Sequence, residues 1–398
     1  MLALQFPVLR LTLLTLAALS QLYLLYCLWR AMRGSRRSSR FTAGATGLAA
    51  AGMAVLFLLN LVIGSRPIPW VDPPALVRIG LLYPAAIWTF GSLLAGPALL
   101  LVRGAAGLVR LLRRGWEREG GPSDSNPVNP ERRRLLQAGA WSMAAAPMVI
   151  AGYGAAWAGR RPELRELHLP FGCPVRVVQL TDIHAGLYMT RTDIRRIAET
   201  AGRLKPELLV LTGDFISNSM AFLPGCVEEL ARIRAPLGTF ATLGNHEHRF
   251  GDPEETRREL ERHGIPMLTN THRRIETARG TFVVAGIDDL QTGNPDLEAA
   301  LRDLDPALPV LLLSHRPEIF PEAAARRIPV TLSGHWHGGQ VVLQILGKRY
   351  SLVHSRTPYV EGLFQDGASR LYVSRGLGTT ATPVRWNAPP EITLLHLT

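Results

Sequence analysis

The sequence predicts an α-helical membrane region followed by an α/β domain, and three observations support this division. Four long stretches without a charged residue lie in the first 160 residues, and no comparably apolar stretch follows. Beyond residue 160, short apolar runs alternate with helical patterns, which is typical of α/β architecture. Several of these runs end just before Asp, Asn or His, and ligands in such folds gather outside the carboxyl ends of the strands.

Each uncharged stretch is long enough to span a membrane. They lie between Arg10 and Arg30, Arg40 and Arg66, Arg78 and Arg103, and Arg134 and Arg160. Crossing a hydrocarbon core of about 30 Å takes roughly 20 residues. We therefore expect a membrane region at 1–116 with three transmembrane helices and a basic interfacial helix near 104–119. A linker and a fourth apolar helix are expected at 117–160, and an α/β domain at 161–398.

The net charge of +12 belongs to the membrane region. Residues 1–160 contain 17 Arg and 5 acidic residues, whereas residues 161–398 contain 27 basic and 27 acidic residues. A protein that binds nucleic acid would be expected to have a basic stripe on its working domain. We therefore do not expect nucleic acid as the main partner.

The arginines also predict an orientation in the membrane. Residues 30–40 contain five Arg and residues 103–134 contain eight, but the loop at 64–78 has only Arg66 and Arg78. Positively charged loops stay in the cytoplasm. This places the α/β domain on the external or periplasmic face. If the fourth apolar segment is instead a buried or hairpin helix, the domain lies in the cytoplasm.

A run of arginines precedes the fourth apolar segment. Residues 132–137 read Arg-Arg-Arg-Leu-Leu-Gln, which resembles a twin-arginine export signal. Plain anchoring by positive charge produces the same pattern. The sequence leaves both interpretations open, and with them whether this segment spans the membrane or is cleaved.

The apolar periodicity predicts the elements of the α/β domain. Strands are expected at 175–180, 208–211, 239–243, 282–286, 310–313, 330–332, 371–373 and 392–397. Helices are expected at 191–204, 228–233, 253–263, 297–304 and 318–327.

The polar residues at the strand ends form five ordered blocks. These blocks are Asp182-Ile183-His184, Gly213-Asp214, Gly244-Asn245-His246-Glu247, His315, and Gly334-His335-Trp336-His337-Gly338. Their oxygen and imidazole groups suit borderline first-row divalent metals. Because they exceed what one ion needs, we expect two adjacent ions that share a carboxylate.

The series DxH, GD, GNHE, H and GHxH resembles the signature of the calcineurin-like metallophosphoesterase superfamily over residues 170–345. The closing Gly338-Gly339-Gln340 resembles its bacterial membrane-associated, often exported branch, the GHxHGGQ type. The resemblance implies a four-layer α/β/β/α sandwich and two divalent ions, which could be Mn, Fe or Zn. It implies that Asp182, His184 and His337 hold one ion, that Asp214 bridges, and that Asn245, His315 and His335 complete the second.

The expected chemistry follows from two cations about 3.5–4 Å apart, which clamp phosphate oxygens and hold a hydroxide between them. His246 is the spare imidazole, and we assign it the proton for the leaving group. Glu247 is expected to orient His246, as carboxylates often orient imidazoles. His248 and Trp336 are further candidates for contact with the site or the substrate.

The sequence thus predicts a membrane-anchored metallophosphoesterase that hydrolyses a phosphodiester or pyrophosphate. Its partners would be the lipid bilayer and a phosphate-ester substrate at the membrane or cell envelope, because anchoring raises the effective concentration of such substrates. The enzymatic alternatives are a UDP-diacylglucosamine-type pyrophosphate hydrolase and a small-nucleotide phosphodiesterase. The non-enzymatic alternative is a membrane sensor or scaffold with a vestigial domain, and the complete ligand set counts against it.

Overall fold

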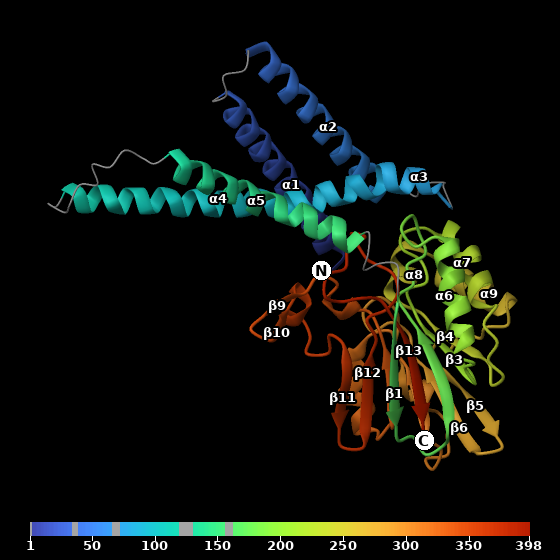
Figure 1. The fold of residues 1–398 in the computed structure, drawn as a ribbon. Coiled ribbons are helices and arrows are strands. Elements are labelled where there is room, and N and C mark those ends of the chain that lie inside the picture. The colour runs from blue at the N-terminus through green and yellow to red at the C-terminus, as the bar shows by residue number, and fades with distance from the viewer. Residues whose placement is uncertain (1, 34–38, 66–71, 119–129, 156–161) are drawn as a thin grey trace. The chain divides into compact units, whose positions relative to one another are not determined.

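The computed structural model describes residues 2–33, 39–65, 72–118, 130–155 and 162–398. The chain forms two compact units (Figure 1). The helical unit comprises residues 1–66 and 79–153, and the α/β unit comprises residues 67–78 and 154–398.

The helical unit consists of long helices, as the uncharged stretches predict. They are α1 (Leu2–Arg33), α2 (Ser39–Ser65), α4 (Tyr83–Arg118) and α5 (Pro130–Tyr153). The short α3 (Ala75–Val77), which belongs to the α/β unit, and the π-helical turn η1 (Arg78–Leu82) precede α4. The interfacial helix expected near 104–119 is not separate, because α4 continues without a break to Arg118. The predicted polar linker lies largely at 119–129, outside the described residues.

Among the described residues, one helix is long and apolar enough to cross a membrane, and it runs over Ala75–Leu112. A shorter apolar helix covers Ala43–Leu59. The prediction of several spans therefore stays a prediction.

Small residues bring α1 and α4 close together. A side chain at Gly96 would collide with Ser20, so the two backbones approach at this point. At the same contact, Gln21 Nε2 donates a hydrogen bond of 3.0 Å to Ser92 Oγ. Small residues and interhelical hydrogen bonds of this kind are typical of helix packing in membranes.

The α/β unit contains two large mixed sheets. The first has the order β1-β13-β2-β3-β4, and its strands are β1 (Glu163–Leu169), β13 (Glu391–Leu397), β2 (Val175–Leu180), β3 (Leu208–Thr212) and β4 (Thr239–Thr242). The second has the order β11-β12-β8-β7-β6-β5, and its strands are β11 (Gly362–Asp366), β12 (Ser369–Val373), β8 (Val330–Ser333), β7 (Val310–Leu313), β6 (Gly280–Gly286) and β5 (Thr271–Thr277). A separate hairpin pairs β9 (Leu343–Ile345) with β10 (Lys348–Tyr350).

The helices of this unit are short. They are α6 (Arg191–Arg203), α7 (Leu223–Leu230), α8 (Asn245–Phe250), α9 (Pro253–Arg262), α10 (Leu297–Ala300) and α11 (Phe320–Ala325). The unit also contains four short 3-10 helices, which are η3 (Met220–Phe222), η4 (Pro317–Ile319), η5 (His337–Gly339) and η6 (Leu352–Ser355).

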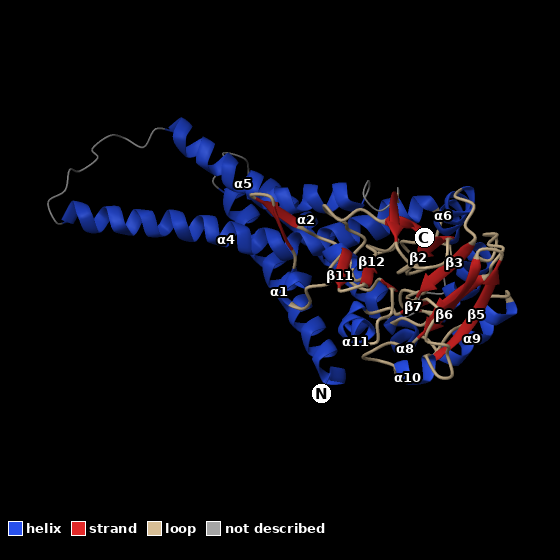
Figure 2. Cartoon of the chain, turned by 90° about the horizontal axis from the view of Figure 1, so that it is seen from below, coloured by secondary structure: helices blue, strands red, loops and turns tan. Residues whose placement is uncertain are grey.

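The two sheets pack face to face around the main hydrophobic core. Val177 and Val210 of the first sheet belong to the same buried cluster as Phe282, Leu311 and Val330 of the second. Side chains alternate between the faces of a strand, and in the central strands the outward residues, such as Val178, Leu209 and Leu312, are buried as well. Figure 2 shows α6 outside the first sheet and α10 and α11 outside the second. This arrangement confirms the expected α/β/β/α sandwich.

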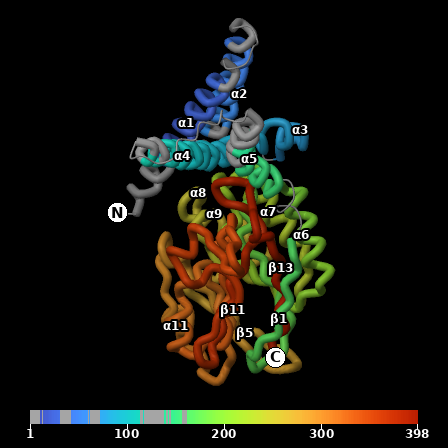
Figure 3. Tube along the Cα trace, turned by 60° about the vertical axis from the view of Figure 1, so that its left-hand side comes forward, coloured from blue at the N-terminus to red at the C-terminus, as the bar shows by residue number. Residues whose placement is uncertain are grey.

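The strands that the sequence did not predict are exposed. β1, with the sequence ELRELHL, and β5, with the sequence THRRIET, lie at sheet edges and expose most of their side chains. β1 pairs in parallel with β13 along its whole length (Figure 3). The predicted helix at 228–233 begins earlier, at Leu223, and the one at 297–304 ends at Ala300.

Leu311→Ala tests the core between the sheets. Leu311 is fully buried in that core, and removing a buried Leu side chain costs about 2–5 kcal/mol of unfolding free energy. The matched control is Leu363→Ala on β11, whose side chain is exposed. Denaturant titration of the detergent-solubilised chain measures both. Equal loss in the two variants would contradict the packing described here.

Candidate metal centre

The predicted site residues follow strands of both sheets and meet at one end of the sandwich. Asp182, Asp214 and Asn245 come after β2, β3 and β4, which lie side by side in the first sheet. His315 and His335 come after β7 and β8, which are parallel neighbours in the second. Carboxyl ends of parallel strands share one sheet edge, so the topology gathers these side chains.

The backbone at these residues has an uncommon conformation. Five of the predicted ligands have positive φ angles between 50° and 74°, namely Asp182, His184, Asp214, His335 and His337. Each such non-glycine residue costs of order 1–3 kcal/mol, and strained residues cluster at functional sites. The rest of the fold therefore has to hold this region in place.

Glycines make room for the carboxylates. A side chain at Gly244 would collide with the Asp214 carboxylate, and one at Gly334 would collide with Asp182. These two positions of the predicted GNHE and GHxH blocks thus require the absence of a Cβ atom.

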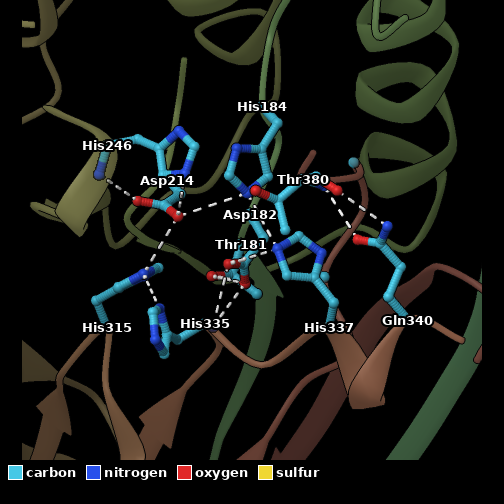
Figure 4. A network of polar contacts seen from close by, with 12 residues as sticks. Thr181, Asp182, His184, Asp214, His246, His315, His335, His337, Gln340 and Thr380 are labelled. Atoms are coloured by element: carbon cyan, nitrogen blue, oxygen red, sulfur yellow. Dashed lines mark hydrogen bonds and ion pairs between the residues drawn. The ribbon is translucent and has the colours of Figure 1, made fainter. Parts of the chain in front are cut away.

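One group of ligands forms around Asp182. His184 Nε2 lies 3.0 Å from His337 Nε2, and His337 Nε2 lies 3.6 Å from Asp182 Oδ1 (Figure 4). All three residues are buried, and their ligand atoms lie within 4.8 Å of one another.

A second group forms around Asp214. Asp214 Oδ2 lies 3.4 Å from His315 Nε2, which lies 3.1 Å from His335 Nδ1. The same carboxylate oxygen lies 3.5 Å from His184 Nε2 of the first group. Asp214 therefore stands between the two groups, where the sequence places a bridging ligand.

Asn245 lies on the side of His335. Its Oδ1 accepts from Arg316 Nη2 at 3.4 Å, and Nη1 of the same guanidinium donates to His335 Nε2 at 2.7 Å. The structure thus brings all seven predicted ligand residues into one region.

Most of the site imidazoles are held neutral. Burial lowers the pKa of His184 to about 3, and it also lowers the pKa values of His335 and His337 well below the ordinary range. Burial opposes protonation of His315 too, but the Asp214 carboxylate outweighs it and raises the pKa of His315 to about 10. A cation beside Asp214 would take the place of that proton.

The carboxylates respond to the same surroundings in opposite ways. Burial raises the pKa of Asp182 to about 6. Burial also opposes ionisation of Asp214, but positive charge on His315 and His246 outweighs it and holds the Asp214 pKa well below its ordinary value.

His246 points its second ring nitrogen at the site. Its Nδ1 lies 2.5 Å from the carbonyl oxygen of Ser217, which can only accept, so Nδ1 bears the proton. Its Nε2 then faces Asp214 Oδ2 at 4.0 Å, and its backbone N–H donates to Asp214 Oδ1 at 2.9 Å.

Glu247 differs from its expected role. Its carboxylate accepts from the backbone N–H groups of Gly244, Asp214 and Phe215 at 2.8–3.0 Å. These are amides of the ligand loops, so Glu247 fixes the loops themselves. Among the hydrogen bonds of the described residues, none joins its carboxylate to the His246 ring.

The other two candidates have partners at the edge of the site. His248 Nε2 lies 2.7 Å from Asp288 Oδ1, and this hydrogen bond raises the His248 pKa. The Trp336 indole donates to Glu318 at 2.8 Å, and its ring meets that of His335 edge to face.

Two buried arginines were missed at the sequence level. Arg316 donates from Nε to buried Asp289 at 2.8 Å, which aims its guanidinium at His335. Arg385 is 0% exposed, and its Nη2 lies 3.1 Å from His337 Nδ1. In the sequence, a buried arginine cannot be distinguished from an exposed one. The only signal for Arg316 is that it directly follows the predicted ligand His315.

Comparison with known proteins agrees with this geometry. The calcineurin-like phosphoesterase family profile matches residues 175–339. The metallophosphoesterase YkuE of Bacillus subtilis is 33% identical over 225 residues, which cover 56% of this chain and 78% of that protein. A metallophosphoesterase of Aquifex aeolicus is 31% identical over 58% of this chain and 87% of its own length.

A relative from Danio rerio is named transmembrane protein with metallophosphoesterase domain. It is 30% identical over 63% of this chain and 60% of its own length. Together with the sandwich fold and the gathered histidines and carboxylates, these similarities show that the chain belongs to the calcineurin-like metallophosphoesterase family, whose members are metal-dependent phosphoesterases.

Proposed function

We propose that this enzyme is anchored in a membrane and hydrolyses a phosphodiester or pyrophosphate bond of a substrate at the membrane surface. The observation that carries the proposal is the position of Asp214, whose Oδ2 lies within 4.0 Å of ring nitrogens of His184, His246 and His315. One carboxylate oxygen thus reaches both ligand groups and the spare imidazole.

The residues present fit two divalent ions. In each ligand group two imidazole nitrogens lie close together, at 3.0 Å in the pair His184–His337 and at 3.1 Å in the pair His315–His335. Two such nitrogens can direct their lone pairs at one cation. Asp182, His184 and His337 would hold one ion, Asn245, His315 and His335 the other, and Asp214 would bridge. Nitrogen and oxygen donors of this kind accept Mn, Fe or Zn. Bound ions supply Lewis acidity, which polarises the phosphoryl group and lowers the pKa of water.

The chain itself supplies the proton for the leaving group. Because Ser217 fixes the Nδ1 proton of His246, only Nε2 can gain and lose a proton at the site. A protonated Nε2 can donate to the oxygen that departs from phosphorus, and such general acids contribute about 10²–10⁴-fold in rate. The bond between the His246 amide and Asp214 keeps this ring beside the bridging carboxylate.

The membrane anchor is supported by the apolar helix at Ala75–Leu112 and by the loop before it. Arg78 Nη1 lies 3.0 Å from Asp193 Oδ2, and Asp72 accepts from the Arg191 backbone N–H at 3.1 Å. Both contacts lie within the α/β unit. They support a location of the catalytic domain on the same side as the loop at 64–78.

That loop has few arginines, and its neighbours on either side have many. By the positive-inside rule, the loop and the domain that contacts it would face outward. We therefore favour an external or periplasmic active site, with phosphodiesters of the envelope or of phospholipid head groups as substrates.

Replacing the two aspartates separates the two ion sites. Asp214→Asn is expected to lower bound metal below roughly one ion per chain, because both groups lose their shared charge. Asp182→Asn affects one group and should leave about one ion. Metal analysis of the purified chain measures this, with Asp288→Asn as a control that retains both. Equal metal content in all three variants would contradict the shared-carboxylate arrangement.

His246→Gln tests the proton donor. We expect kcat to fall by about 10²–10⁴-fold for a phosphodiester with an alkyl leaving group. The loss should be much smaller for bis-p-nitrophenyl phosphate, since p-nitrophenolate departs without a proton. His263→Gln, at the residue that follows α9, is the matched control. A loss that does not depend on the leaving group would remove His246 from this role.

Cysteine labelling tests the orientation. The three native cysteines are buried, so an impermeant maleimide would report on introduced cysteines. On intact spheroplasts we expect Ala278→Cys, in the β5–β6 turn, to react and Ser35→Cys, in the arginine-rich sequence at 30–40, to react only after lysis. The reverse pattern would place the active site in the cytoplasm and favour a cytoplasmic lipid-precursor pyrophosphate.

A further inference from the structure

The hairpin that follows the GHxH block exposes an unusual set of side chains. Five large apolar residues are exposed within residues 343–352, which we call the apolar hairpin, namely Leu343, Ile345, Leu346, Tyr350 and Leu352. Leu346 is 98% exposed and Leu352 is 89% exposed. Figure 1 shows β9 and β10 projecting from the body of the sandwich.

The tip of the hairpin contains a leucine that the turn alone would not select. Leu346 and Gly347 both have positive φ angles, 49° and 78°. A two-residue turn of this kind favours Asn-Gly or Gly-Gly, because a side chain such as Leu is strained there. Leucine is unfavourable at this position for two reasons, because its backbone is strained and its apolar side chain is exposed to water. Such a cost calls for a partner that covers Leu346.

The charge around the hairpin indicates which partner. Residues 341–360 contain three cations, Lys348, Arg349 and Arg356, and no acidic residue, although residues 161–398 as a whole are neutral. Arg349 is paired with Glu361 at 2.6 Å, so the exposed Lys348 and Arg356 supply the positive charge beside the apolar side chains. Apolar side chains flanked by cations match the interface of an anionic bilayer, where the acyl boundary receives the former and the head groups attract the latter.

The base of the hairpin is fixed to the metal centre. It follows directly on η5, which begins at His337. Gln340 Nε2 donates to the carbonyl oxygens of Thr380 and Thr382, and Gln340 Oε1 accepts from the Thr380 backbone N–H. Each of these three hydrogen bonds is 3.0 Å long. Val342 N–H donates to Trp386 at 2.9 Å. A membrane surface that binds the hairpin would therefore also fix the distance between that surface and the loop that contains His335 and His337.

We propose that the apolar hairpin inserts into the interface of an anionic bilayer and presents the metal centre to a phosphate ester whose acyl chains stay in that bilayer. This inference rests on the proposed function and narrows its substrate to the lipid class. A second copy of this chain is the competing occupant of the hairpin, and the first experiment separates the two.

The first experiment locates the hairpin. Leu346→Cys in the full chain is labelled with the environment-sensitive dye NBD and reconstituted in phosphatidylglycerol nanodiscs, one chain per disc. The buried native cysteines keep background labelling low. We expect a blue-shifted emission that doxyl-labelled lipid quenches, whereas Ala278→Cys shows neither effect. Emission that lipid does not quench overturns the proposal, and a shift that appears only with several chains per disc points to a second copy.

The second experiment separates this inference from the proposed function. Two phosphodiesters with the same leaving group are compared in the same nanodiscs, soluble bis-p-nitrophenyl phosphate and the p-nitrophenyl ester of phosphatidic acid. Leu346→Asp with Leu352→Asp should lower kcat/KM at least tenfold for the lipid ester and leave the soluble ester unchanged. Leu363→Asp, an exposed leucine on β11, is the control.

The outcomes are distinct. If the unmodified chain hydrolyses neither ester, the proposed function fails. If it hydrolyses both and the double variant matches it on the lipid ester, only the hairpin inference fails. If the double variant loses both esters equally, the hairpin acts through the structure of the site, and the bilayer assignment is likewise wrong.

Discussion

The site depends on one buried carboxylate that is not itself a predicted ligand. Glu247 collects the backbone amides of Gly244, Asp214 and Phe215 and thereby ties the loop after β3 to the loop after β4. Burial and the neighbouring Asp214 raise the Glu247 pKa, and the amides offset part of that cost. These hydrogen bonds to Glu247 hold Asp214 in its left-handed backbone conformation and in its position between the two histidine groups.

Charge balance is the second constraint on the same region. Asp182, Asp214 and Glu247 are all buried, and burying an unpaired charge is costly. Two buried arginines, Arg316 and Arg385, stand behind the ligand histidines and supply positive charge without entering the ligand groups. Because a guanidinium only donates, it also fixes the orientation of the imidazole that it contacts. The ligands are therefore supported from outside by donors as well as by the strained backbone.

The sequence was most informative where local pattern and tertiary role coincide. β2 and β7 begin and end at the predicted residues, because strands buried on both faces read as continuous apolar runs. The seven predicted ligands could be proposed from the sequence because they lie in blocks that follow such strands. The edge strands β1 and β5 were missed, since their mostly polar, exposed sequences give no such signal. The burial of Arg316, the partners of Glu247 and the continuity of α4 depend on contacts between distant segments, which no local pattern records.

The order of strands in the first sheet has a consequence for how the enzyme is made. β13 lies between β1 and β2 and pairs with both, so the first two strands of the domain meet only through a strand that ends at Leu397. This sheet is therefore complete only after residues 391–397 have paired with strands that lie far earlier in the chain. Pairing between such distant segments is slow, because the loop between them must close before any contact is gained. Among the described strands β1 pairs only with β13, so a change that weakens β13 would release β1 as well.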